Sequence, residues 1–379
     1  MKFIHLSDLH IGKRVNEFSM LEDQEYILKQ ILDITDQQKP DGVIIAGDVY
    51  DKSVPSAEAV TLFDDFLVEL SKRNLHVFVI SGNHDSPERI AFGGRLMQAS
   101  RIYMSPVYDG DIKPVTLEDK YGKINIWMLP FVKPAHVRKL YEDREIESYT
   151  DAMKTVIDNL CINTEERNIM ITHQFVTGAE RSESEEISVG GTDNVDVSVF
   201  DAFDYTALGH IHKPQNCKSE RVRYSGTPLK YSFSEAKDQK SVTVAELSEK
   251  GNLTVTTVPL KPLRDMVELR GRYEELIARD FYKGTSYQED YVHIILTDEE
   301  DILDAIGKLR IVYRNLMKLD YDNLRTRNQN VIDKAENVKK KAPDEHFCEF
   351  FEKQNNQPMS DIQKEIIKNL VSEIWEGEI

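Results

Sequence analysis

The alternation of short β-branched runs with amphipathic helical stretches most constrains the fold of this 379-residue chain, and it fills the first two-thirds. Such alternation is typical of a layered α/β domain. We expect strands at residues 3–6, 42–46, 76–80, 124–129, 169–172 and 205–208. Helices should separate the first three strands, one with Ile27 and Leu28 on its apolar face and the next with Phe63. The expected architecture is therefore β-sheets flanked by helices.

Five of these strands are followed at once by short polar segments. The segments are Asp8-Leu9-His10, Gly47-Asp48-Val49-Tyr50-Asp51, Gly82-Asn83-His84-Asp85, Thr172-His173-Gln174 and Gly209-His210-Ile211-His212. One DxH or HxH pair alone is more often a solvated loop than a pair of ligands. Open α/β sheets bind ligands beside the carboxyl ends of their strands, so five segments in this position predict one shared site.

The residue types in these segments favour metal ions. Carboxylate, amide and imidazole ligands suit manganese, iron, zinc or magnesium, whereas a soft thiolate site would need cysteine. Asp8 and His10 lie two residues apart, so on an extended backbone their side chains would share a face and converge on one ion. His210 and His212 have the same spacing. Asp48 directly follows a buried strand, where its charge is costly unless cations neutralise it, as a bridging position would.

Small and uncharged residues complete the expected site. Gly47 and Gly82 allow tight turns that aim the next side chain inward. Asn83 supplies an amide oxygen without adding negative charge to the site. We assign Asp85 to the turn that follows His84.

The set DxH, GDxxD, GNHD, a lone histidine after a strand and GHxH resembles the calcineurin-like metallophosphoesterase superfamily. Three longer segments, "ISGNHDSPERIAFGGRLM", "ALGHIHKPQ" and "YSGTPLKYSFSE", resemble the SbcD family, the subunits of bacterial SbcCD nucleases and kin to the double-strand-break repair nucleases of eukaryotes and archaea. Specific motifs carry this resemblance over residues 1–260, and length and layout carry it beyond them. It implies a layered metallophosphoesterase sandwich with a second, small α/β capping domain and C-terminal helices.

The resemblance also implies a role for each motif residue. The implied ligands are Asp8, His10, Asp48 and His212 for one metal, and Asp48, Asn83, His173 and His210 for the other. His84 would be the acid or charge-stabilising group near the leaving oxygen, and the Asp51 carboxylate would orient its imidazole. The cofactors would be two divalent ions, with manganese preferred.

The sequence pattern divides the chain into three regions. Residues 1–260 form the expected nuclease domain and end in a hairpin of residues 241–247 and 253–258. Residues 264–325 repeat strand, helix and strand as a small α/β domain, with a helix expected over residues 299–313, and residues 326–379 are polar and helical. The resemblance implies that the small domain caps the site and helps to select DNA. It also implies that the terminal helices grip an SbcC-type coiled-coil ATPase.

Three further stretches each allow two interpretations. The last helix has Ser360 and Gln363 at capping-box spacing and an apolar stripe, which either packs on its own domain or docks onto another protein. Residues 87–97 either form a buried core helix or, as the resemblance implies, a dimerisation surface, giving a homodimer within a heterotetramer. The acidic residues 177–197 are expected to form a surface loop, with a gate for substrate as the alternative.

The formal net charge of −18 argues against a broad basic surface for nucleic acid. Contact with double-stranded DNA should therefore be local, metal-assisted or partly supplied by a partner. Candidate contacts beside the motifs are Lys13, Arg14, Arg89 and Lys213, although each alone is more simply an ordinary surface charge. No apolar run approaches the roughly 20 residues that cross a bilayer, and no secretory segment precedes the first strand. We expect a cytoplasmic protein with no membrane contact.

Three functions fit this sequence. The first is a DNA exonuclease and endonuclease acting on double-strand ends and hairpins in repair, recombination and replication. The second is a phosphomonoesterase or small-molecule phosphodiesterase on the same dimetal site, because fold and ligands do not set the substrate. The third is a non-catalytic adaptor for an ATPase, against which the complete ligand set argues. The added α/β domain and the striped terminal helix favour the first.

Overall fold

The computed structural model describes residues 1–180, 182, 184, 185, 194–300, 302–323, 347, 351, 359, 360 and 362–367. Packing divides the chain into two units. The first unit comprises Met1–Arg270, Glu274–Ile295 and Asp304–Asp320. The second holds the described residues of Gly271–Tyr273, of Leu296–Leu303 and from Tyr321 onward.

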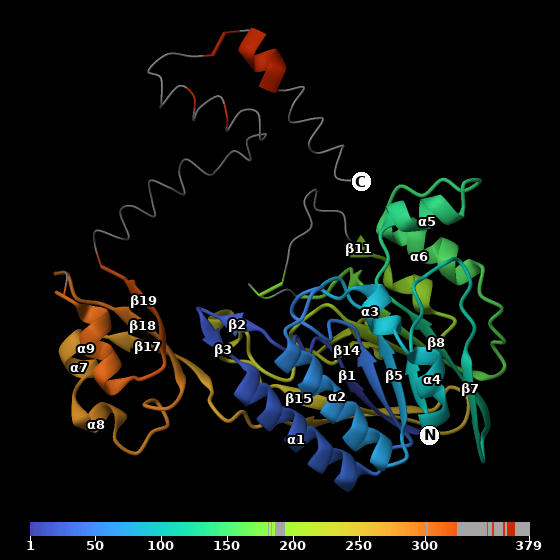
Figure 1. Cartoon of the computed structure of the whole chain (residues 1–379), viewed down its shortest axis with the longest axis horizontal. Helices are drawn as coiled ribbons and strands as arrows, with labels where there is room; N and C mark the ends of the chain where they lie inside the picture. Colours follow the sequence, from blue (N-terminus) through green and yellow to red (C-terminus); the bar gives the residue numbers. More distant parts are fainter. Residues whose placement is uncertain are drawn as a thin grey trace. The chain divides into compact units, whose positions relative to one another are not determined.

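Two six-stranded sheets form the body of the first unit (Figure 1). The first sheet has the order β16-β15-β1-β4-β5-β6, with the strands Leu253–Pro259, Ser241–Leu247, Lys2–Leu6, Gly42–Ala46, His76–Ile80 and Ile102–Met104. Strands β1, β4, β5 and β6 are parallel, whereas β15 runs antiparallel to β1. The loops that follow β1, β4 and β5 therefore leave the sheet at the same edge.

The second sheet has the order β13-β14-β12-β9-β8-β7, with the strands Gln215–Cys217, Ser219–Tyr224, Tyr205–Gly209, Arg167–His173, Gly122–Leu129 and Val115–Asp119. Strands β14, β12, β9 and β8 are parallel, and antiparallel β13 and β7 flank them. The carboxyl ends of β9 and β12 again share one edge of the sheet.

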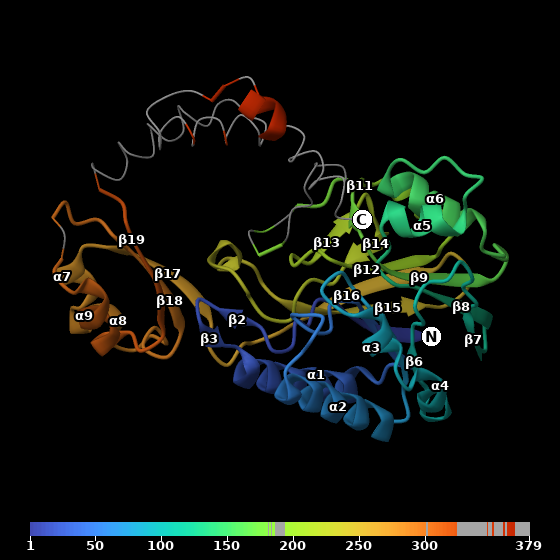
Figure 2. The same ribbon diagram turned by 45° about the horizontal axis from the view of Figure 1, so that its top comes forward.

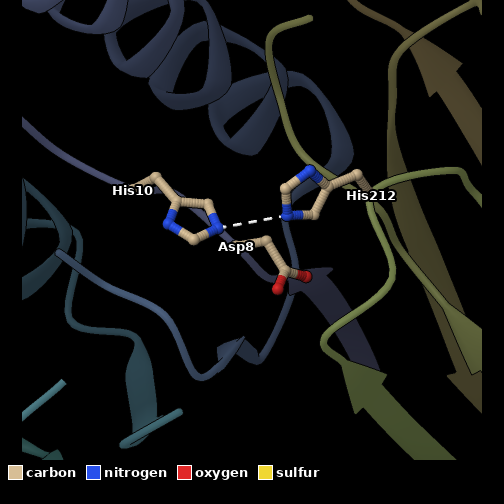
Figure 3. A group of neighbouring side chains, drawn as sticks. All are labelled: Asp8, His10 and His212. Carbon is tan, nitrogen blue, oxygen red and sulfur yellow. Dashed lines mark hydrogen bonds between the residues drawn. The ribbon is translucent and has the colours of Figure 1, made fainter. Parts of the chain in front are cut away.

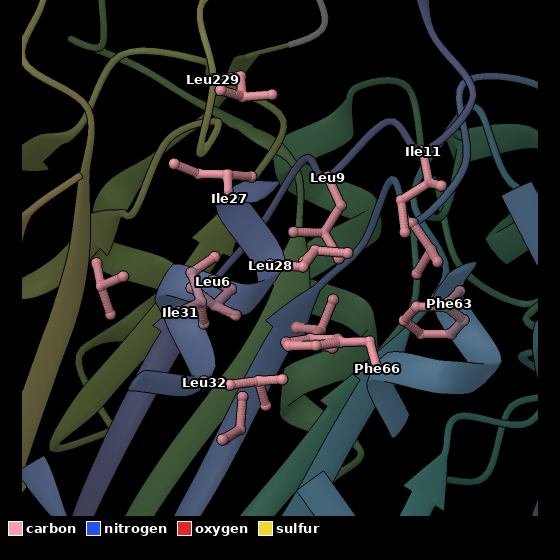
Figure 4. Packing of buried hydrophobic residues seen from close by; sticks show 14 of the residues in the cluster. Leu6, Leu9, Ile11, Ile27, Leu28, Ile31, Leu32, Phe63, Phe66 and Leu229 are labelled. Atoms are coloured by element: carbon pink, nitrogen blue, oxygen red, sulfur yellow. The ribbon is translucent and has the colours of Figure 1, made fainter. Parts of the chain in front are cut away.

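Helices cover the outer faces of these sheets (Figure 2). Helices α1 (Leu21–Gln38) and α2 (Ala57–Lys72) pack on the first sheet, while α5 (Pro134–Leu140) and α6 (Tyr149–Asp158) pack on the second. Figure 4 shows Ile31 of α1 beside Leu6 of β1 in the first of these cores, to which Phe66 of α2 also belongs. The predicted layered α/β sandwich is confirmed.

Burial on both faces explains the composition of the central strands. Every residue of β4 and of β9 is buried, and both β4 and residues 169–171 at the centre of β9 are continuous apolar runs, as covered parallel strands usually are. Between the sheets, a separate cluster packs Phe3 and Phe78 of the first sheet against Ile126 and Ile171 of the second sheet.

Helix α2 begins where the Ser56 side chain accepts a hydrogen bond from the Ala59 N–H, 3.3 Å away.

Smaller elements complete the described chain. Two-stranded pairs are β2 (Arg14–Val15) with β3 (Phe18–Ser19) and β10 (Phe175–Val176) with β11 (Asn194–Val195). Short helices are α3 (Pro87–Ala91), α4 (Gly94–Met97), η1 (Gln98–Ser100), η2 (Val197–Phe200) and η3 (Phe233–Glu235). A three-stranded sheet of β17 (Met266–Gly271), β18 (Tyr291–Leu296) and β19 (Leu316–Tyr321) accompanies α7 (Tyr273–Leu276), α8 (Arg279–Tyr282) and α9 (Ala305–Val312).

Two predicted helices differ from the structure. A single core helix over residues 87–97 is wrong, because Phe92 leaves the helical conformation and Gly93 has a φ of 72°. Phe92 and Leu96 are 81% and 84% exposed. A helix expected to begin at residue 299 begins at Ala305 instead, after Asp304 adopts a left-handed φ of 51°. The hairpin of β15 and β16 is confirmed.

The described part of the tail shows the predicted capping box. The Ser360 N–H donates to Gln363 Oε1 over 2.9 Å, and the Gln363 N–H donates back to Ser360 Oγ over 3.4 Å. Residues 362–367 are helical, with Ile362 and Ile366 exposed. The rest of the apolar stripe, at Leu370 and Ile374, lies outside the described residues.

The three-region division of the chain remains a prediction. Among the described residues, the structure contains no helix with the length and apolarity to cross a membrane.

Candidate metal centre

The five polar segments lie where the sequence places them, at the carboxyl ends of five strands. Asp8 and His10 follow β1, Asp48 follows β4, Asn83 and His84 follow β5, His173 ends β9, and His210 and His212 follow β12. Because the carboxyl ends of both sheets meet, the structure brings all seven predicted ligands into two overlapping groups.

The first group joins the loops after β1 and β12 (Figure 3). His10 Nε2 and His212 Nε2 face each other at 3.2 Å, beside the Asp8 carboxylate. One ligand atom from each of these three residues lies within 4.8 Å of the others. Asp48 Oδ2 lies 3.7 Å from the same His10 Nε2. Three or four atoms of this kind can converge on one cation.

The second group also contains Asp48. Asp48 Oδ2 is 3.3 Å from His173 Nε2, and Asn83 Oδ1 is 2.9 Å from that same nitrogen. His210 Nδ1 lies 3.0 Å from Asn83 Oδ1. One carboxylate oxygen of Asp48 therefore borders both groups, which is the position that a bridging ligand needs.

Backbone conformation aims these side chains. Asp8, His10 and Asp48 have left-handed φ values of 53°, 45° and 47°, and His210 has a φ of 105°. Such conformations cost about 1 kcal/mol or more for non-glycine residues and gather at functional sites. The expected extended backbone at Asp8 and His10 is therefore wrong. The two side chains converge because two left-handed residues turn the loop, not because strand alternation places them on one face.

Two glycines leave room for the closest approaches in the site. Gly47 has a φ of 86°, and a Cβ there would lie 2.5 Å from His173 Nδ1. A Cβ on Gly82 would collide with Asp48 Oδ1 and with the Asp48 main-chain nitrogen. Gly47 therefore supplies a turn, as predicted, whereas Gly82 supplies space for Asp48.

Buried polar side chains hold the ligand loops together. The Asp85 carboxylate accepts hydrogen bonds from the N–H groups of Gly82, Val49 and Tyr50, at 2.9, 3.0 and 2.9 Å, so it ties two ligand loops together. Gln24 of α1 donates to the His10 carbonyl over 2.7 Å. Sequence reasoning missed Gln24, although a polar residue on the buried face of an amphipathic helix was a signal for it.

Electrostatics at the site shows the effect of burying charged groups. Burial raises the pKa of Asp8 to about 7 and lowers the pKa of His10 well below its usual value. Burial opposes charge at Asp48 and His173 as well, but their mutual attraction outweighs it. The pKa of Asp48 is therefore well below its usual value, and that of His173 is raised to about 9. A divalent cation would supply the positive charge that the His173 proton supplies here.

The donor set fits a hard or borderline divalent cation. Asp8 Oδ2 and His10 Nδ1 are buried without a hydrogen-bond partner among the described residues, and such orphaned atoms are uncommon in folded proteins. Carboxylate, amide and imidazole atoms match manganese, iron, zinc or magnesium. The site can therefore bind divalent metal, and the donors alone do not select among these ions.

His84 borders the first group without the predicted carboxylate contact. The main-chain N–H of His84 donates to Asp48 Oδ1 over 2.9 Å, and Nδ1 of its ring lies 3.1 Å from the main-chain oxygen of Asp51. The Asp51 carboxylate instead accepts from Lys13 Nζ over 2.7 Å. The prediction that this carboxylate orients His84 is therefore wrong, because the adjacent lysine engages it. His10, Asp48 and His84 also lie close enough together to hold an ion.

The other candidate DNA contacts are divided between exposed and paired positions. Arg14 and Arg89 are exposed, and the Arg14 guanidinium donates to the main-chain oxygen of Glu17. Lys213 is ion-paired with Glu180 at 2.5 Å. Contact of these residues with DNA remains a prediction.

Described residues of the acidic stretch 177–197 reach the site. Ser184 Oγ lies 2.6 Å from His212 Nδ1, and Glu185 Oε1 accepts from the His212 N–H over 2.6 Å. Behind Ser184 lie Glu235 and Lys240, both buried. Sequence reasoning assigned no role to these two residues, although Glu235 closes the quoted segment "YSGTPLKYSFSE".

Comparison with known proteins gives two family-model matches and similarity to solved structures. A family model described as calcineurin-like phosphoesterase matches residues 1–214. A second, described as the type 5 capsule protein repressor C-terminal domain, matches residues 262–355. A solved dimetal phosphatase from Danio rerio is 13% identical, with a TM-score of 0.40, over 69% of this chain and 98% of that chain.

Two curated relatives are both named as the SbcD component of the nuclease SbcCD. The one from Staphylococcus epidermidis is 33% identical over 387 residues, spanning 100% of both chains. The one from Staphylococcus saprophyticus is 33% identical over 323 residues, spanning 84% of each chain. With the phosphoesterase model matching the region that holds all seven candidate ligands, and one relative aligned from end to end, the chain belongs to the SbcD family of calcineurin-like phosphoesterases.

Proposed function

We propose that this chain is a two-metal DNA nuclease that hydrolyses phosphodiester bonds at double-strand ends and hairpins. The observation that carries the proposal is the convergence of seven ligands from five loops on two groups that share Asp48 Oδ2. Full-length similarity to relatives named as nuclease components supports DNA as the substrate class.

The chemistry follows from the positions of the side chains. A pair of divalent cations in such a site lowers the pKa of a water molecule and stabilises charge on both apical oxygens of a phosphodiester. Asp48 would hold both cations, with Asp8, His10 and His212 on one side and Asn83, His173 and His210 on the other. Manganese is our preferred identity for both ions.

His84 is our candidate for the proton donor to the leaving sugar oxygen. The Asp51 carbonyl can accept the proton on its Nδ1, which fixes the ring and leaves Nε2 to face the substrate. Its main-chain N–H bond to Asp48 Oδ1 keeps the ring at a constant position relative to the ligands. In this role, His84 acts on the substrate rather than on the metal.

The partner assignments belong to the same proposal. An SbcC-type ATPase would bind the terminal helices and supply much of the DNA surface, since this chain carries a net charge of −18. The small α/β region would cap the site and favour DNA over small esters. We place the assembly, a homodimer of this chain with two ATPase subunits, in the cytoplasm.

One assay tests the substrate class. Purified protein is incubated with Mn²⁺ and labelled linear or hairpin DNA, in parallel with p-nitrophenyl phosphate and bis-p-nitrophenyl phosphate, with and without the ATPase subunit. The proposal predicts DNA cleavage that is lost in Asp48→Asn. Monoester turnover with intact DNA, even with the ATPase subunit present, would instead establish a phosphomonoesterase.

A further inference from the structure

A buried ion pair lies directly behind the metal ligand His212. Glu235 is 0% exposed and Lys240 is 4% exposed, and Glu235 Oε2 lies 2.5 Å from Lys240 Nζ. Burying two charges carries a desolvation penalty that their mutual attraction often does not repay, so such a pair is weak support for stability by itself. Its position beside a ligand points to another role.

The pair reaches the His212 ring through Ser184. Ser184 Oγ lies 2.5 Å from Glu235 Oε1 and 2.6 Å from His212 Nδ1. The carboxylate of a charged pair can only accept, so the Ser184 O–H donates to it and Ser184 Oγ accepts the proton on His212 Nδ1. This arrangement selects the tautomer whose Nε2 carries no proton. That Nε2 is the atom 3.2 Å from His10 Nε2, inside the first ligand group.

The same pair also holds the main chain of His212. Lys240 Nζ donates to the His212 carbonyl over 2.9 Å while it contacts Glu235. The contacts form a closed circuit from the imidazole through Ser184, Glu235 and Lys240 back to the His212 backbone. His173 differs, since its Nδ1 lies 2.9 Å from the main-chain oxygen of Ala46. Side chains therefore orient His212, whereas the backbone orients His173.

We propose that Glu235, acting through Ser184 and Lys240, is a positioning residue that fixes the tautomer and orientation of His212 for metal binding. This inference rests on the proposed function in that it takes His212 as a ligand. Metal-ligating histidines commonly donate their second N–H to a carboxylate, and loss of that outer partner lowers metal affinity about 10- to 100-fold. Here a serine hydroxyl extends the contact by one hydrogen bond.

The experiment compares Ser184→Ala, Ser184→Thr and Glu235→Gln with wild type in the full-length protein. Mn²⁺ binding is measured by calorimetry without DNA, and the His212 tautomer is read from ¹⁵N chemical shifts of the metal-free protein. Glu25→Gln is the matched control, because Glu25 forms an exposed ion pair with Lys29, also at 2.5 Å, on α1. Urea unfolding of each variant reports whether it is folded.

We expect Ser184→Ala and Glu235→Gln to lower the affinity of one of the two Mn²⁺ sites about 10- to 100-fold and leave the other near wild type. In the metal-free protein, both should lose the uniform tautomer with the proton on Nδ1. Ser184→Thr keeps the hydroxyl, so its Mn²⁺ affinities and its His212 tautomer should match those of wild type. Glu25→Gln should also match wild type. Ser184→Ala removes no buried charge, so it keeps the test decisive if Glu235→Gln does not fold.

Three results would overturn the inference. If Ser184→Ala leaves both affinities and the tautomer unchanged while wild type binds two ions, the positioning role is wrong and the proposed function stands. A loss of affinity that Ser184→Thr does not restore would indicate a general structural effect. A wild-type protein that binds no Mn²⁺ would overturn both this inference and the proposed nuclease.

Discussion

Buried His5 should make the stability of this protein depend on pH in a calculable way. It lies on β1, three residues before Asp8, and is fully buried. Its Nδ1 is 2.8 Å from the Tyr205 hydroxyl, and its Nε2 is 3.2 Å from the Leu208 carbonyl. A neutral ring satisfies both contacts by accepting from the tyrosine and donating to the carbonyl. These bonds join the two sheets directly beneath the ligand loops.

Burial, assisted by the nearby positive charge of Arg223, lowers the pKa of His5 from 6.5 to about 3. Because the folded pKa is below the unfolded one, the stabilisation is complete above pH 6.5 and is lost as the pH falls toward 3. Between pH 8 and pH 5 the unfolded chain gains a proton here that the folded chain does not. This difference removes about 2 kcal/mol from the free energy of unfolding, and the full shift corresponds to about 5 kcal/mol.

The assay is urea unfolding of wild type and His5→Gln at pH 8 and pH 5, with EDTA in every sample. Glutamine does not titrate, so the free energy of unfolding of wild type should fall by about 2 kcal/mol more than that of the variant. Groups common to both proteins cancel in this comparison. The exposed Gln37→Ala is the control, because it removes no titrating group, and it should follow wild type. Equal decreases for wild type and His5→Gln would refute the reasoning.

Three further changes test the site. His84→Ala should still bind two Mn²⁺ ions but lower DNA turnover about 10²- to 10⁴-fold, and a metal titration that finds an empty site would reject its assignment as proton donor. Gly82→Ala places a methyl group against Asp48 Oδ1 and should weaken Mn²⁺ binding about 10- to 100-fold, as measured by calorimetry. An unchanged affinity would contradict the described close approach of Gly82 to Asp48. Asp85→Ala removes the acceptor of three main-chain N–H groups and should cost about 3 kcal/mol in urea unfolding, whereas a loss below about 1 kcal/mol would show that the loops do not depend on it.

Sequence reasoning predicted which candidate ligands would lie together, because these residues follow strands with strong signals. The short apolar runs at residues 42–46 and 169–171 predict strands of a covered sheet, so the polar residues after them are expected at the edge of that sheet. Sequence reasoning did not predict the backbone conformation of the loops that carry these residues. The left-handed conformations of Asp8 and His10 depend on contacts with neighbouring loops, such as the bond from the Asp8 N–H to the Gly47 carbonyl at 3.0 Å. No local pattern in the sequence reports such a contact.

The sequence also did not predict which groups the charged side chains contact. Asp51 contacts Lys13 rather than the His84 ring, and Glu235 reaches His212 across 23 residues of sequence. Such pairings depend on how separate loops pack, which residue spacing does not determine. The break at Phe92 has a more local cause, since Gly93 adopts a positive φ within an otherwise helical pattern.

Two neighbouring cations held by seven side chains are the central claim of this account. Anomalous diffraction from a crystal soaked in MnCl₂ tests it most directly. We expect two manganese peaks about 3.5 to 4 Å apart, with Asp48 touching both and the remaining six ligands divided between them. A single peak, or ligands that point away from the peaks, would contradict it.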